Sequence, residues 1–241
     1  MSTVLITGAT SGIGFQLAQD YLANGDQVVV CGRNPIALKD FEQQGTNVET
    51  LQFDITNAEA TGLALEGMQS KPNIWIFNAG NCEYIESGEI DSALMKRVFE
   101  ANFLGLVNSL QAAQRFFKPG DQVIVIGSIS SEVALPRAEA YGASKAAVSY
   151  LARTLQMTLK PKQIDVTVVY PGFVKTPLTD KNTFDMPMIV TAEEASVAIR
   201  RGIEKRQPYI YFPSRFTSIL RVIGLLPYRW QNALSSKLLK G

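Results

Sequence analysis

Short apolar runs rich in β-branched residues alternate along this chain with longer segments in which apolar residues recur at helical spacing. The short runs predict strands at residues 4–7, 27–31, 48–53, 74–77, 122–127, 165–170 and 209–212. The longer segments predict helices at residues 13–24, 35–44, 58–69, 91–117, 138–159 and 192–205. Thr191 and Glu194 have the spacing of a capping box at the start of the last helix.

Strict alternation of strands and helices predicts an α/β, Rossmann-type doubly wound fold. Several strands are apolar throughout, as in residues 123–126, which is typical of a parallel strand covered on both faces. We therefore expect a single parallel sheet of about seven strands with helices on both faces. No linker, repeat or low-complexity tract divides the chain, so residues 1–241 are expected to form one domain.

Composition excludes several classes of function. The net charge is +1, which argues against a nucleic-acid partner because a phosphate backbone requires a basic face. The chain has no histidine, so zinc or iron sites that need imidazole and a Ser-His-Asp triad are excluded. Cys31 and Cys82 form no cluster of metal ligands, and both are expected to be buried free thiols. No metal is expected.

The chain begins directly with its first apolar run, without a charged leader, and no run of 18 apolar residues occurs. Neither a signal peptide nor an ordinary membrane span is therefore expected. The predicted location is the cytoplasm, with peripheral contact at the inner membrane surface as an alternative.

A glycine-rich turn follows the first predicted strand. Gly8, Gly12 and Gly14 have the spacing G-x3-G-x-G and lead into the helix at 13–24. The N–H groups and the dipole at the start of a helix favour a pyrophosphate. In this position Gly8 permits a tight turn, Gly12 permits close approach of a phosphate, and Gly14 permits close packing of helix on sheet.

A second group of residues is suited to proton transfer. Tyr141 and Lys145 are four residues apart and share one face of the helix at 138–159. Ser128 follows an apolar strand, at the carboxyl end where ligands bind in open α/β sheets. A nearby ammonium favours the phenolate, so we expect Lys145 to lower the pKa of Tyr141 from about 10. The Ser128 hydroxyl can hold and polarise a carbonyl oxygen.

Together these motifs resemble the short-chain dehydrogenase/reductase family, in its single-domain branch. The residues that carry the resemblance are Thr7-Gly8-Ala-Thr-Ser-Gly12-Ile-Gly14, Phe53-Asp54-Ile55, Asn78-Ala79-Gly80, Asn102, Ser128, Tyr141-x-x-x-Lys145 and Pro171-Gly172 with Thr176. The resemblance covers about residues 3–212. It implies a catalytic set of Asn102, Ser128, Tyr141 and Lys145, in which Asn102 holds a water in a proton relay and Lys145 also binds the nicotinamide ribose.

The resemblance also implies a cofactor site. Asp54 and its neighbour would meet the adenine, and the segment from Pro171 to Thr176 would close over the nicotinamide. With Arg33 added by position, the predicted cofactor-binding residues are Gly8, Thr10, Ser11, Gly12, Ile13, Gly14, Arg33, Asp54, Ile55, Asn78, Ala79, Gly80, Tyr141, Lys145, Pro171, Gly172, Val174 and Thr176.

The residues after the second strand bear on which dinucleotide binds. In this fold the end of that strand meets the adenosine ribose, where a carboxylate favours NAD. The sequence here is Cys31-Gly32-Arg33-Asn34, without an acid. Arg33 can pair with a 2′-phosphate, and the Ser11 hydroxyl can add a contact. NADP(H) is therefore the favoured cofactor, with NAD(H) and a solvated Arg33 as the alternative.

These observations predict an NADP(H)-dependent oxidoreductase that transfers hydride between nicotinamide and a ketone or secondary alcohol, with Tyr141 as acid and base. One alternative is an NAD(H)-dependent alcohol dehydrogenase of the same family, and another is a non-catalytic dinucleotide-binding regulator. An epimerase or dehydratase of the extended branch is disfavoured, because those enzymes carry a G-x-x-G-x-x-G loop and a larger C-terminal domain.

The C-terminal third carries the features expected to vary with substrate. By resemblance, residues 178–190 form a substrate loop, and Phe173, Phe184, Met186 and Met188 either line an apolar pocket or pack beneath a flap. Residues 214–241 form an apolar and basic extension with Arg215, Arg221 and Arg229. This extension is expected to cover the pocket, to pack against another subunit or to contact a membrane surface. The resemblance implies a homo-oligomer, a dimer or tetramer, built on the helices at 91–117 and 138–159.

Overall fold

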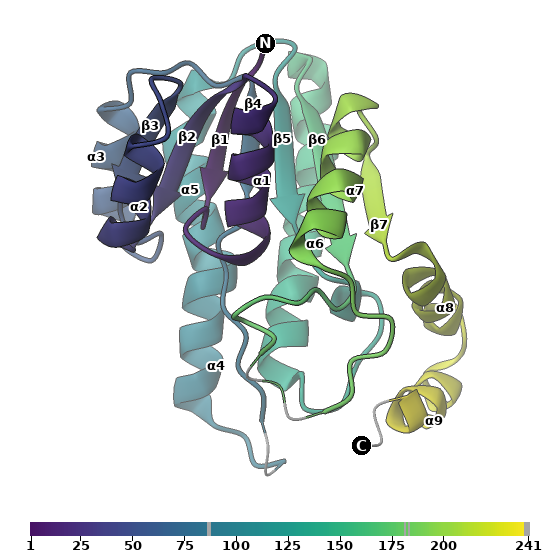
Figure 1. The fold of residues 1–241 in the computed structure, drawn as a ribbon. Helices are drawn as coiled ribbons and strands as arrows, with labels where there is room; N and C mark the ends of the chain where they lie inside the picture. The colour runs from purple at the N-terminus through teal and green to yellow at the C-terminus, as the bar shows by residue number, and fades with distance from the viewer. Residues whose placement is uncertain (86–87, 181, 183, 239–241) are drawn as a thin grey trace.

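The computed structural model describes residues 1–85, 88–180, 182 and 184–238. Within them seven strands form one parallel sheet in the order β3-β2-β1-β4-β5-β6-β7, which confirms the predicted fold class (Figure 1). The strands are β1 Thr3–Thr7, β2 Gln27–Gly32, β3 Val48–Gln52, β4 Ile74–Phe77, β5 Gln122–Ile126, β6 Asp165–Pro171 and β7 Tyr209–Phe212. Each lies within one residue of its predicted bounds.

Helices cover both faces of the sheet (Figure 1). They are α1 Gly12–Ala23, α2 Pro35–Glu42, α3 Ala58–Glu66, α4 Ser92–Phe99, α5 Gly105–Ala113, α6 Glu139–Leu159, α7 Ala192–Glu204, α8 Ser214–Gly224 and α9 Tyr228–Leu238. Among the described residues, none of these helices is long and apolar enough to cross a membrane.

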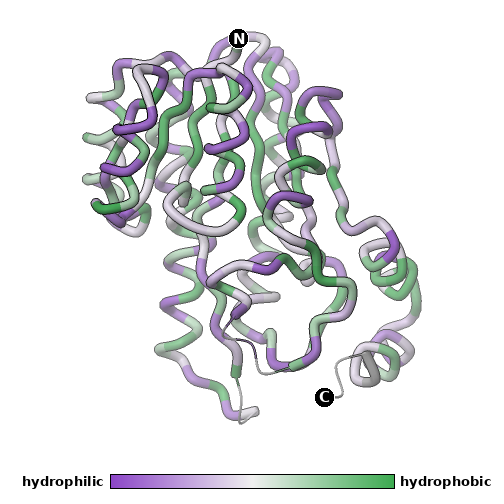
Figure 2. The backbone as a smooth tube through the Cα atoms, in the orientation of Figure 1, coloured by the Kyte–Doolittle hydropathy of each residue, from purple (hydrophilic) through white to green (hydrophobic). Residues whose placement is uncertain are grey.

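Alternate side chains of the strands fill two separate apolar layers. Val4 and Ile6 of β1 pack in the layer under α1, α2 and α7, whereas Leu5 packs in the opposite layer under α3, α5 and α6. The central strands β1, β2, β4 and β5 are correspondingly hydrophobic along most of their length (Figure 2), whereas the edge strand β3 is only partly buried. This burial on both faces explains why the strand segments read as continuous apolar runs in the sequence.

The structure corrects the prediction of one long helix at 91–117. This segment consists of α4, a π-helix at Glu100–Leu104, α5 and a short 3₁₀ turn at Gln114–Phe116. The π-helix places the side chain of Asn102 in the interior, and Gly105 lets Ile55 pack closely, since a Cβ at Gly105 would lie 2.6 Å from the Ile55 Cδ1 atom. Tertiary contacts of this kind leave no trace in the helical periodicity.

The C-terminal extension forms two helices, α8 and α9, for which the sequence analysis gave no secondary structure. The inner side of α8 packs Phe216, Leu220 and Ile223 against Ile129 and Val133, which follow β5. The α8 part of the extension therefore packs on the loop after Ser128.

The capping box predicted at the start of α7 is present. The Thr191 hydroxyl accepts a hydrogen bond from the Glu194 N–H at 3.2 Å, and the Glu194 carboxylate accepts one from the Thr191 N–H at 2.9 Å. These two bonds satisfy N–H groups that have no partner within the helix.

We expect the substitution Thr191→Ala to lower the free energy of unfolding by about 1 kcal/mol, because the helix loses its N-cap acceptor. Urea denaturation measures this change. Thr158→Ala, at an exposed position inside α6, is the matched control and should be neutral or slightly stabilising, because alanine has the higher helix propensity. Equal stability of the T191A variant and the unmodified protein would contradict the proposed contribution of the cap.

Candidate active site

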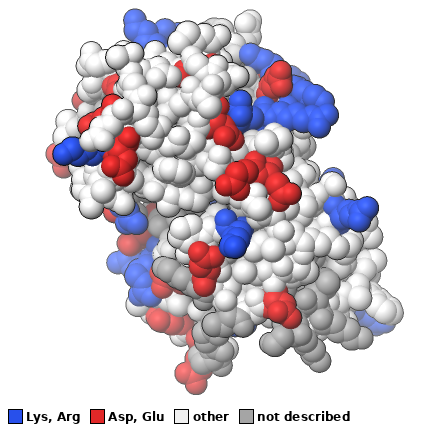
Figure 3. Space-filling view, in the orientation of Figure 1, with Lys and Arg blue, Asp and Glu red and all other residues white. Residues whose placement is uncertain are grey.

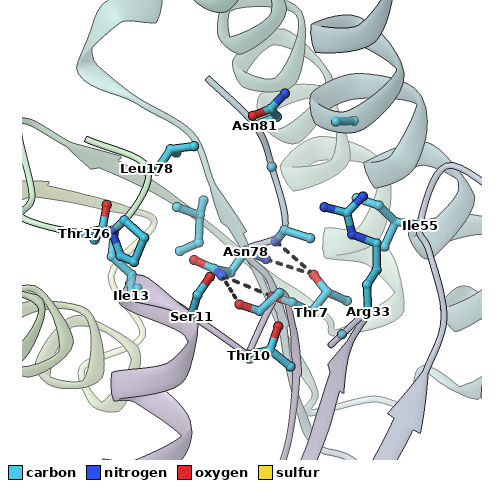
Figure 4. A pocket seen from close by; sticks show the side chains of 18 of the residues that line it. Thr7, Thr10, Ser11, Ile13, Arg33, Ile55, Asn78, Asn81, Thr176 and Leu178 are labelled. Carbon is cyan, nitrogen blue, oxygen red and sulfur yellow. Dashed lines mark hydrogen bonds between the residues drawn. The ribbon is translucent and has the colours of Figure 1, made fainter. Parts of the chain in front are cut away.

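A cleft of about 620 Å³ opens at the carboxyl ends of the strands (Figure 4). The strand order reverses its direction between β1 and β4, and the loops that follow these two strands diverge there. Such a switch point is where open α/β sheets bind their ligands. In Figure 4, Arg33 and Ile55 lie toward one end of the cleft and Thr176 and Leu178 toward the other, with Asn78 between them.

The glycine-rich turn forms the centre of the cleft wall. Gly8 and Gly12 have φ values of +67° and +56°, in the left-handed region that favours glycine. A Cβ at Gly8 would lie 2.7 Å from the Ala79 Cα, and one at Gly12 would lie 3.2 Å from the Thr176 Cγ2. Backbone therefore meets backbone here, and a larger side chain at either position would disturb the cleft.

Hydrogen bonds join the ends of β1 and β4 beneath this turn (Figure 4). The Asn78 amide donates to the carbonyl oxygens of Thr7 at 3.1 Å and Gly8 at 3.2 Å. The Thr7 hydroxyl oxygen accepts from the N–H groups of Asn78 at 3.1 Å and Ala79 at 3.2 Å. Gly14 packs against the same point, because a Cβ there would lie 2.4 Å from the Gly8 oxygen.

The start of α1 is suited to an anion. Ser11 occupies the N-cap position with an extended backbone, and its side chain makes no capping hydrogen bond. Ser11, Gly12 and Ile13 all line the cleft. The N–H groups and the dipole at the start of this helix favour a phosphate group in the cleft. Together with the space left by the glycines, they fit the pyrophosphate of a dinucleotide.

The opposite end of the cleft carries an ion pair. Arg33 Nη1 lies 3.2 Å from Asp54 Oδ2, and the Arg33 side chain is 76% exposed. Burial alone would raise the pKa of Asp54, but hydrogen bonds from Thr56 and the pairing with Arg33 outweigh it and lower this pKa. Asp54 is therefore a carboxylate that orients the Arg33 guanidinium along the cleft.

The structure gathers the predicted cofactor-binding residues around this one cleft, except for Gly14, which lies beneath it. Those that line it are Gly8, Thr10, Ser11, Gly12, Ile13, Arg33, Asp54, Ile55, Asn78, Ala79, Gly80, Tyr141, Lys145, Pro171, Gly172, Val174 and Thr176. They come from the loops after β1, β2, β3, β4 and β6 and from the first turns of α6. Segments far apart in the sequence thus meet at one site.

Tyr141 and Lys145 lie on the first two turns of α6, with the Lys145 Nζ atom 5.8 Å from the centre of the Tyr141 ring. Lys145 Nζ donates to the Ile126 carbonyl oxygen at 3.0 Å. Burial lowers the pKa of Lys145 to about 8, because the charged ammonium is disfavoured away from water.

The expected lowering of the Tyr141 pKa by Lys145 does not appear in this structure. Burial raises the pKa of the Tyr141 hydroxyl above its ordinary value, and a hydrogen bond from Ser128 opposes this effect only in part. Because the pKa of Lys145 is itself lowered toward neutrality, its ammonium gives the phenolate less support than an exposed lysine would. The Tyr141 hydroxyl is therefore protonated near neutral pH.

Ser128 caps a 3₁₀ turn at Ile129–Ser131 and is buried. Its hydroxyl oxygen accepts from the Ser130 N–H at 3.2 Å and from the Ser130 hydroxyl at 2.9 Å. With both bonds accepted, the Ser128 proton points toward Tyr141, to which Ser128 is hydrogen-bonded. Ser130 thus orients Ser128, a role that its place in a serine-rich run did not reveal.

Hydrogen bonds of Asn102 connect the loop after β4 to α6. Its amide donates to the Asn81 carbonyl and the Ser144 hydroxyl, both at 2.9 Å, and its oxygen accepts from the Asn81 N–H at 2.6 Å. Ser144 in turn donates to the Tyr141 carbonyl at 2.7 Å. A cavity of about 10 Å³, roughly the space of one water, lies beside Asn102 and Lys145.

Sequence reasoning did not select Thr7, Asn81, Ser130 or Ser144 as site residues. The position of Thr7 at the end of the first strand could have identified it, because a hydroxyl there can form a hydrogen bond to the neighbouring strand. The other three carry no motif, and only their contacts with Asn102 or Ser128 identify them. Neither Asn102 nor Ser128 lines the main cleft, and both act on it through Tyr141 and Lys145.

Aromatic side chains adjoin Tyr141 on the side away from the glycine turn. The ring of Tyr84 is centred 6.5 Å from that of Tyr141 and 5.1 Å from that of Phe184, and Phe173 lies 6.0 Å from Phe184. Phe173 also contacts Phe216 of α8 at 5.4 Å. Phe173 and Phe184 therefore lie where an apolar pocket lining was expected.

The rest of the predicted substrate loop is less directly placed. Met188 is half exposed, and the Met186 sulfur accepts from the Asn182 amide at 3.2 Å. Residues 181 and 183 of the predicted loop at 178–190 lie outside the described residues.

The two cysteines differ from each other. Cys31 is a buried free thiol, as expected, whereas Cys82 is only partly buried and lies beside Tyr84. Burial raises the pKa of both thiols, that of Cys82 to about 11. Within the described part of the chain, no three His, Cys, Asp or Glu side chains form a possible metal site.

Comparison with known proteins defines the class. A family model described as short chain dehydrogenase matches residues 2–186. The chain belongs to this family and is an oxidoreductase.

Similar proteins include dehydrogenase/reductase SDR family member 7B from Xenopus laevis, which is 30% identical over 236 residues, 86% of this chain and 72% of the relative. A short chain dehydrogenase from Burkholderia cenocepacia, solved in complex with NADP, is 26% identical with a TM-score of 0.85 and covers 100% of this chain and 98% of its own. A family member from Burkholderia phymatum, solved in complex with NAD, has a TM-score of 0.80 at 20% identity and covers 91% of this chain and 92% of its own, which shows a shared fold.

The lowered pKa of Lys145 predicts a pH dependence of stability. Between about pH 8 and the ordinary lysine pKa of about 10.4, Lys145 is neutral in the folded protein but protonated in the unfolded chain. Unfolding then takes up a proton, so stability due to Lys145 rises with pH across this window, by at most about 1.4 kcal/mol per pH unit.

Urea denaturation of the unmodified protein and of the Lys145→Met variant at pH 7.5, 8.5 and 9.5 measures this effect. We expect the unmodified protein to gain stability relative to K145M as the pH rises. Titrations of the tyrosines and cysteines affect both proteins and cancel in the difference. A stability difference that stays constant or shrinks across these pH values would show that Lys145 is not held near a pKa of 8.

Proposed function

We propose that this protein is an NADP(H)-dependent oxidoreductase that transfers hydride between nicotinamide and a ketone or secondary alcohol, with Tyr141 as the acid and base. The observation that carries the proposal is that Tyr141 and Lys145 line one cleft together with a glycine turn and a helix start, while Ser128 is hydrogen-bonded to Tyr141 from beside that cleft. The NADP complex of the similar Burkholderia cenocepacia protein supports the choice of cofactor.

The residues present fit a nicotinamide dinucleotide. The start of α1 with Gly8 and Gly12 would hold the pyrophosphate, Arg33 the 2′-phosphate, and Lys145 the hydroxyls of the nicotinamide ribose. The segment from Pro171 to Thr176 would cover the nicotinamide, whose reduced form supplies the hydride when it is bound. Asp54 would meet the adenosine.

The protein's own residues perform the proton chemistry. With a substrate bound, Ser128 would turn its single proton from Tyr141 to the substrate carbonyl oxygen, while the Ser130 hydroxyl and N–H continue to donate to the Ser128 oxygen. Tyr141 gives its proton to the same carbonyl oxygen as the carbonyl is reduced. Burial raises the pKa of Tyr141, so its hydroxyl carries the proton at neutral pH and has it available to donate.

Lys145 and Asn102 support Tyr141 from the interior. An ammonium at Lys145 stabilises the phenolate that remains after proton transfer. Asn102 fixes the position of α6 through its hydrogen bond to Ser144. The small cavity beside Asn102 and Lys145 would hold the water through which Tyr141 is reprotonated. The aromatic group of Tyr84, Phe173 and Phe184 favours an apolar substrate.

The two alternatives differ from this proposal in one feature each. An NAD(H)-dependent alcohol dehydrogenase would leave Arg33 as a solvated partner of Asp54, which its exposure permits. A non-catalytic dinucleotide-binding regulator would need no ordered proton pathway. The hydrogen bonds that orient Ser128 and fix Asn102 favour a catalyst over a regulator.

We further propose that the enzyme is a homo-oligomer built on α4, α5 and α6. Tyr150 and Met157 of α6 and Leu104 of the π-helix are large apolar side chains exposed on these helices. Covering them with a second copy would remove apolar surface from water.

We expect Tyr141→Phe to reduce the rate of ketone reduction by about 10²–10⁴-fold, the usual contribution of a positioned acid. Binding of NADPH, followed by nicotinamide fluorescence, should change little because the phenyl ring is kept. Tyr150→Phe, at an exposed position on the same helix, is the matched control and should retain full activity. Full turnover by Y141F on a substrate that the unmodified enzyme reduces would refute the assigned role of Tyr141.

Titration with NADPH and NADH, followed by nicotinamide fluorescence, tests the cofactor preference. We expect NADPH to bind at least tenfold more tightly. Arg33→Ala should weaken NADPH binding by roughly 1.5–3 kcal/mol, the worth of a charged hydrogen bond, and leave NADH binding nearly unchanged. Arg201→Ala, on exposed surface of α7, is the control. Equal affinities would favour the NAD(H) alternative, and binding of neither dinucleotide would favour a function without one.

A further inference from the structure

The last helix buries two polar side chains and leaves large apolar side chains exposed beside polar ones. Gln231 and Ser235, four residues apart on α9, are only 8% and 2% exposed, whereas Trp230 is 52% exposed and Leu234 also faces outward. The Gln231 amide donates to the carbonyl oxygens of Gly224 at 3.0 Å and Leu226 at 2.8 Å. A surface helix in water ordinarily buries its large apolar side chains, so exposed Tyr228, Trp230 and Leu234 leave α9 with apolar surface that another phase or molecule can cover.

The exposed apolar residues continue from α9 onto α8 and the turn between them. Leu225 in this turn and Tyr228 at the start of α9 are 87% and 82% exposed. We call the whole set the α8–α9 surface, and it consists of Ile219, Val222, Leu225, Leu226, Tyr228, Trp230 and Leu234. Both helices lie at the margin of the molecule beyond β7 (Figure 1). A continuous exposed surface of this kind marks an interaction site.

The segment that carries this surface has basic side chains and no carboxylates of its own. Arg215, Arg221 and Arg229 are exposed, and the sequence from residue 205 to residue 241 contains no Asp or Glu. In Figure 3 the region of α8 and α9, at lower right, shows blue and white side chains and no red ones on the face in view. The Arg229 guanidinium lies 5.3 Å from the centre of the Trp230 ring. Aromatic and arginine side chains side by side suit the headgroup level of a membrane.

A second copy of the chain is a poorer fit to this surface. A two-fold interface places the same patch on both subunits, so it would bring the three arginines of one copy toward those of the other. Without a carboxylate among these residues, the charges would repel. An anionic bilayer supplies both an apolar phase for the leucines and tryptophan and negative phosphates for the arginines.

We infer that the α8–α9 surface binds the face of an anionic lipid bilayer. Trp230, Leu225 and Leu234 enter the boundary between headgroups and acyl chains, and the arginines contact lipid phosphates. The inner side of α8 remains packed against Ile129 and Phe173, so binding requires no rearrangement of the catalytic loop. The inference depends on surface chemistry alone and holds whichever dinucleotide the cleft binds.

Sedimentation with vesicles tests this inference on the full chain. We expect the protein to pellet with vesicles of phosphatidylglycerol and phosphatidylcholine, to bind pure phosphatidylcholine far more weakly, and to be partly released by 0.5 M salt. Trp75 is fully buried, so a blue shift of tryptophan emission on adding anionic vesicles reports the entry of Trp230 into lipid.

Two variants separate the apolar and electrostatic parts of the binding. Leu225→Gln with Trp230→Gln should reduce vesicle binding at least tenfold, whereas the control pair Ile36→Gln with Leu63→Gln, also exposed but on α2 and α3, should not. Arg215→Gln with Arg229→Gln should reduce binding by roughly fivefold per arginine. The charge-matched control, Arg201→Gln with Lys205→Gln on and after α7, should have a smaller effect.

Three outcomes would overturn the inference. One is the absence of binding to anionic vesicles at low salt. Another is binding that the L225Q/W230Q variant and its control share equally, which would indicate non-specific attraction. The third is a fall in oligomer mass, measured by light scattering of L225Q/W230Q without any vesicle binding by the unmodified protein, which would assign the surface to a second copy of the chain.

Discussion

The site depends on how closely the ends of β1 and β4 approach each other. Gly8 lies against Ala79 with no room for a side chain between them, and Asn78 and Thr7 fix that approach through four hydrogen bonds. Because the strand order reverses here, any widening would move the glycine turn and the start of α1 away from the loop after β4. The start of α1 and the end of the cleft that carries Tyr141 and Lys145 are therefore positioned by the same junction.

At the catalytic end, burial sets the chemistry. Removal of Tyr141 and Lys145 from water raises the pKa of the first and lowers that of the second, so both shifts favour uncharged groups. Such a pair is poised for transfer of a proton rather than for a permanent ion pair. The cost of burial is offset by specific partners, such as the Ile126 carbonyl for Lys145 and the Ser128 hydroxyl for Tyr141.

Sequence reasoning succeeded where the governing contact is local. The strands, the glycine turn and the spacing of Tyr141 and Lys145 depend on neighbours within a few residues, and the structure has them where they were expected. Prediction from the sequence failed where contacts between segments that are distant in the sequence determine the structure. The π-helix around Asn102 is accompanied by hydrogen bonds between Asn102 and Asn81, which is distant in the sequence. The role of Ser130 is evident only from its hydrogen bond to Ser128. The burial of polar Gln231 on α9 depends on carbonyl groups at the end of α8, which the periodicity of the sequence does not reveal.

Phe216 of α8 contacts Gly172 in the cleft wall. The sequence of α8 can change separately from that of the cleft residues. A Cβ at Gly172 would lie 2.8 Å from the Phe216 Cδ1 atom, so α8 fills space directly beside a residue of the cleft wall. The match to the family model ends at residue 186, and α8 lies beyond it. Substitutions along the inner side of this helix can therefore reshape the volume next to the reacting groups while the groups themselves stay untouched. The shape of the space beside Tyr141 can thus change through a helix that lies outside the residues matched by the family model.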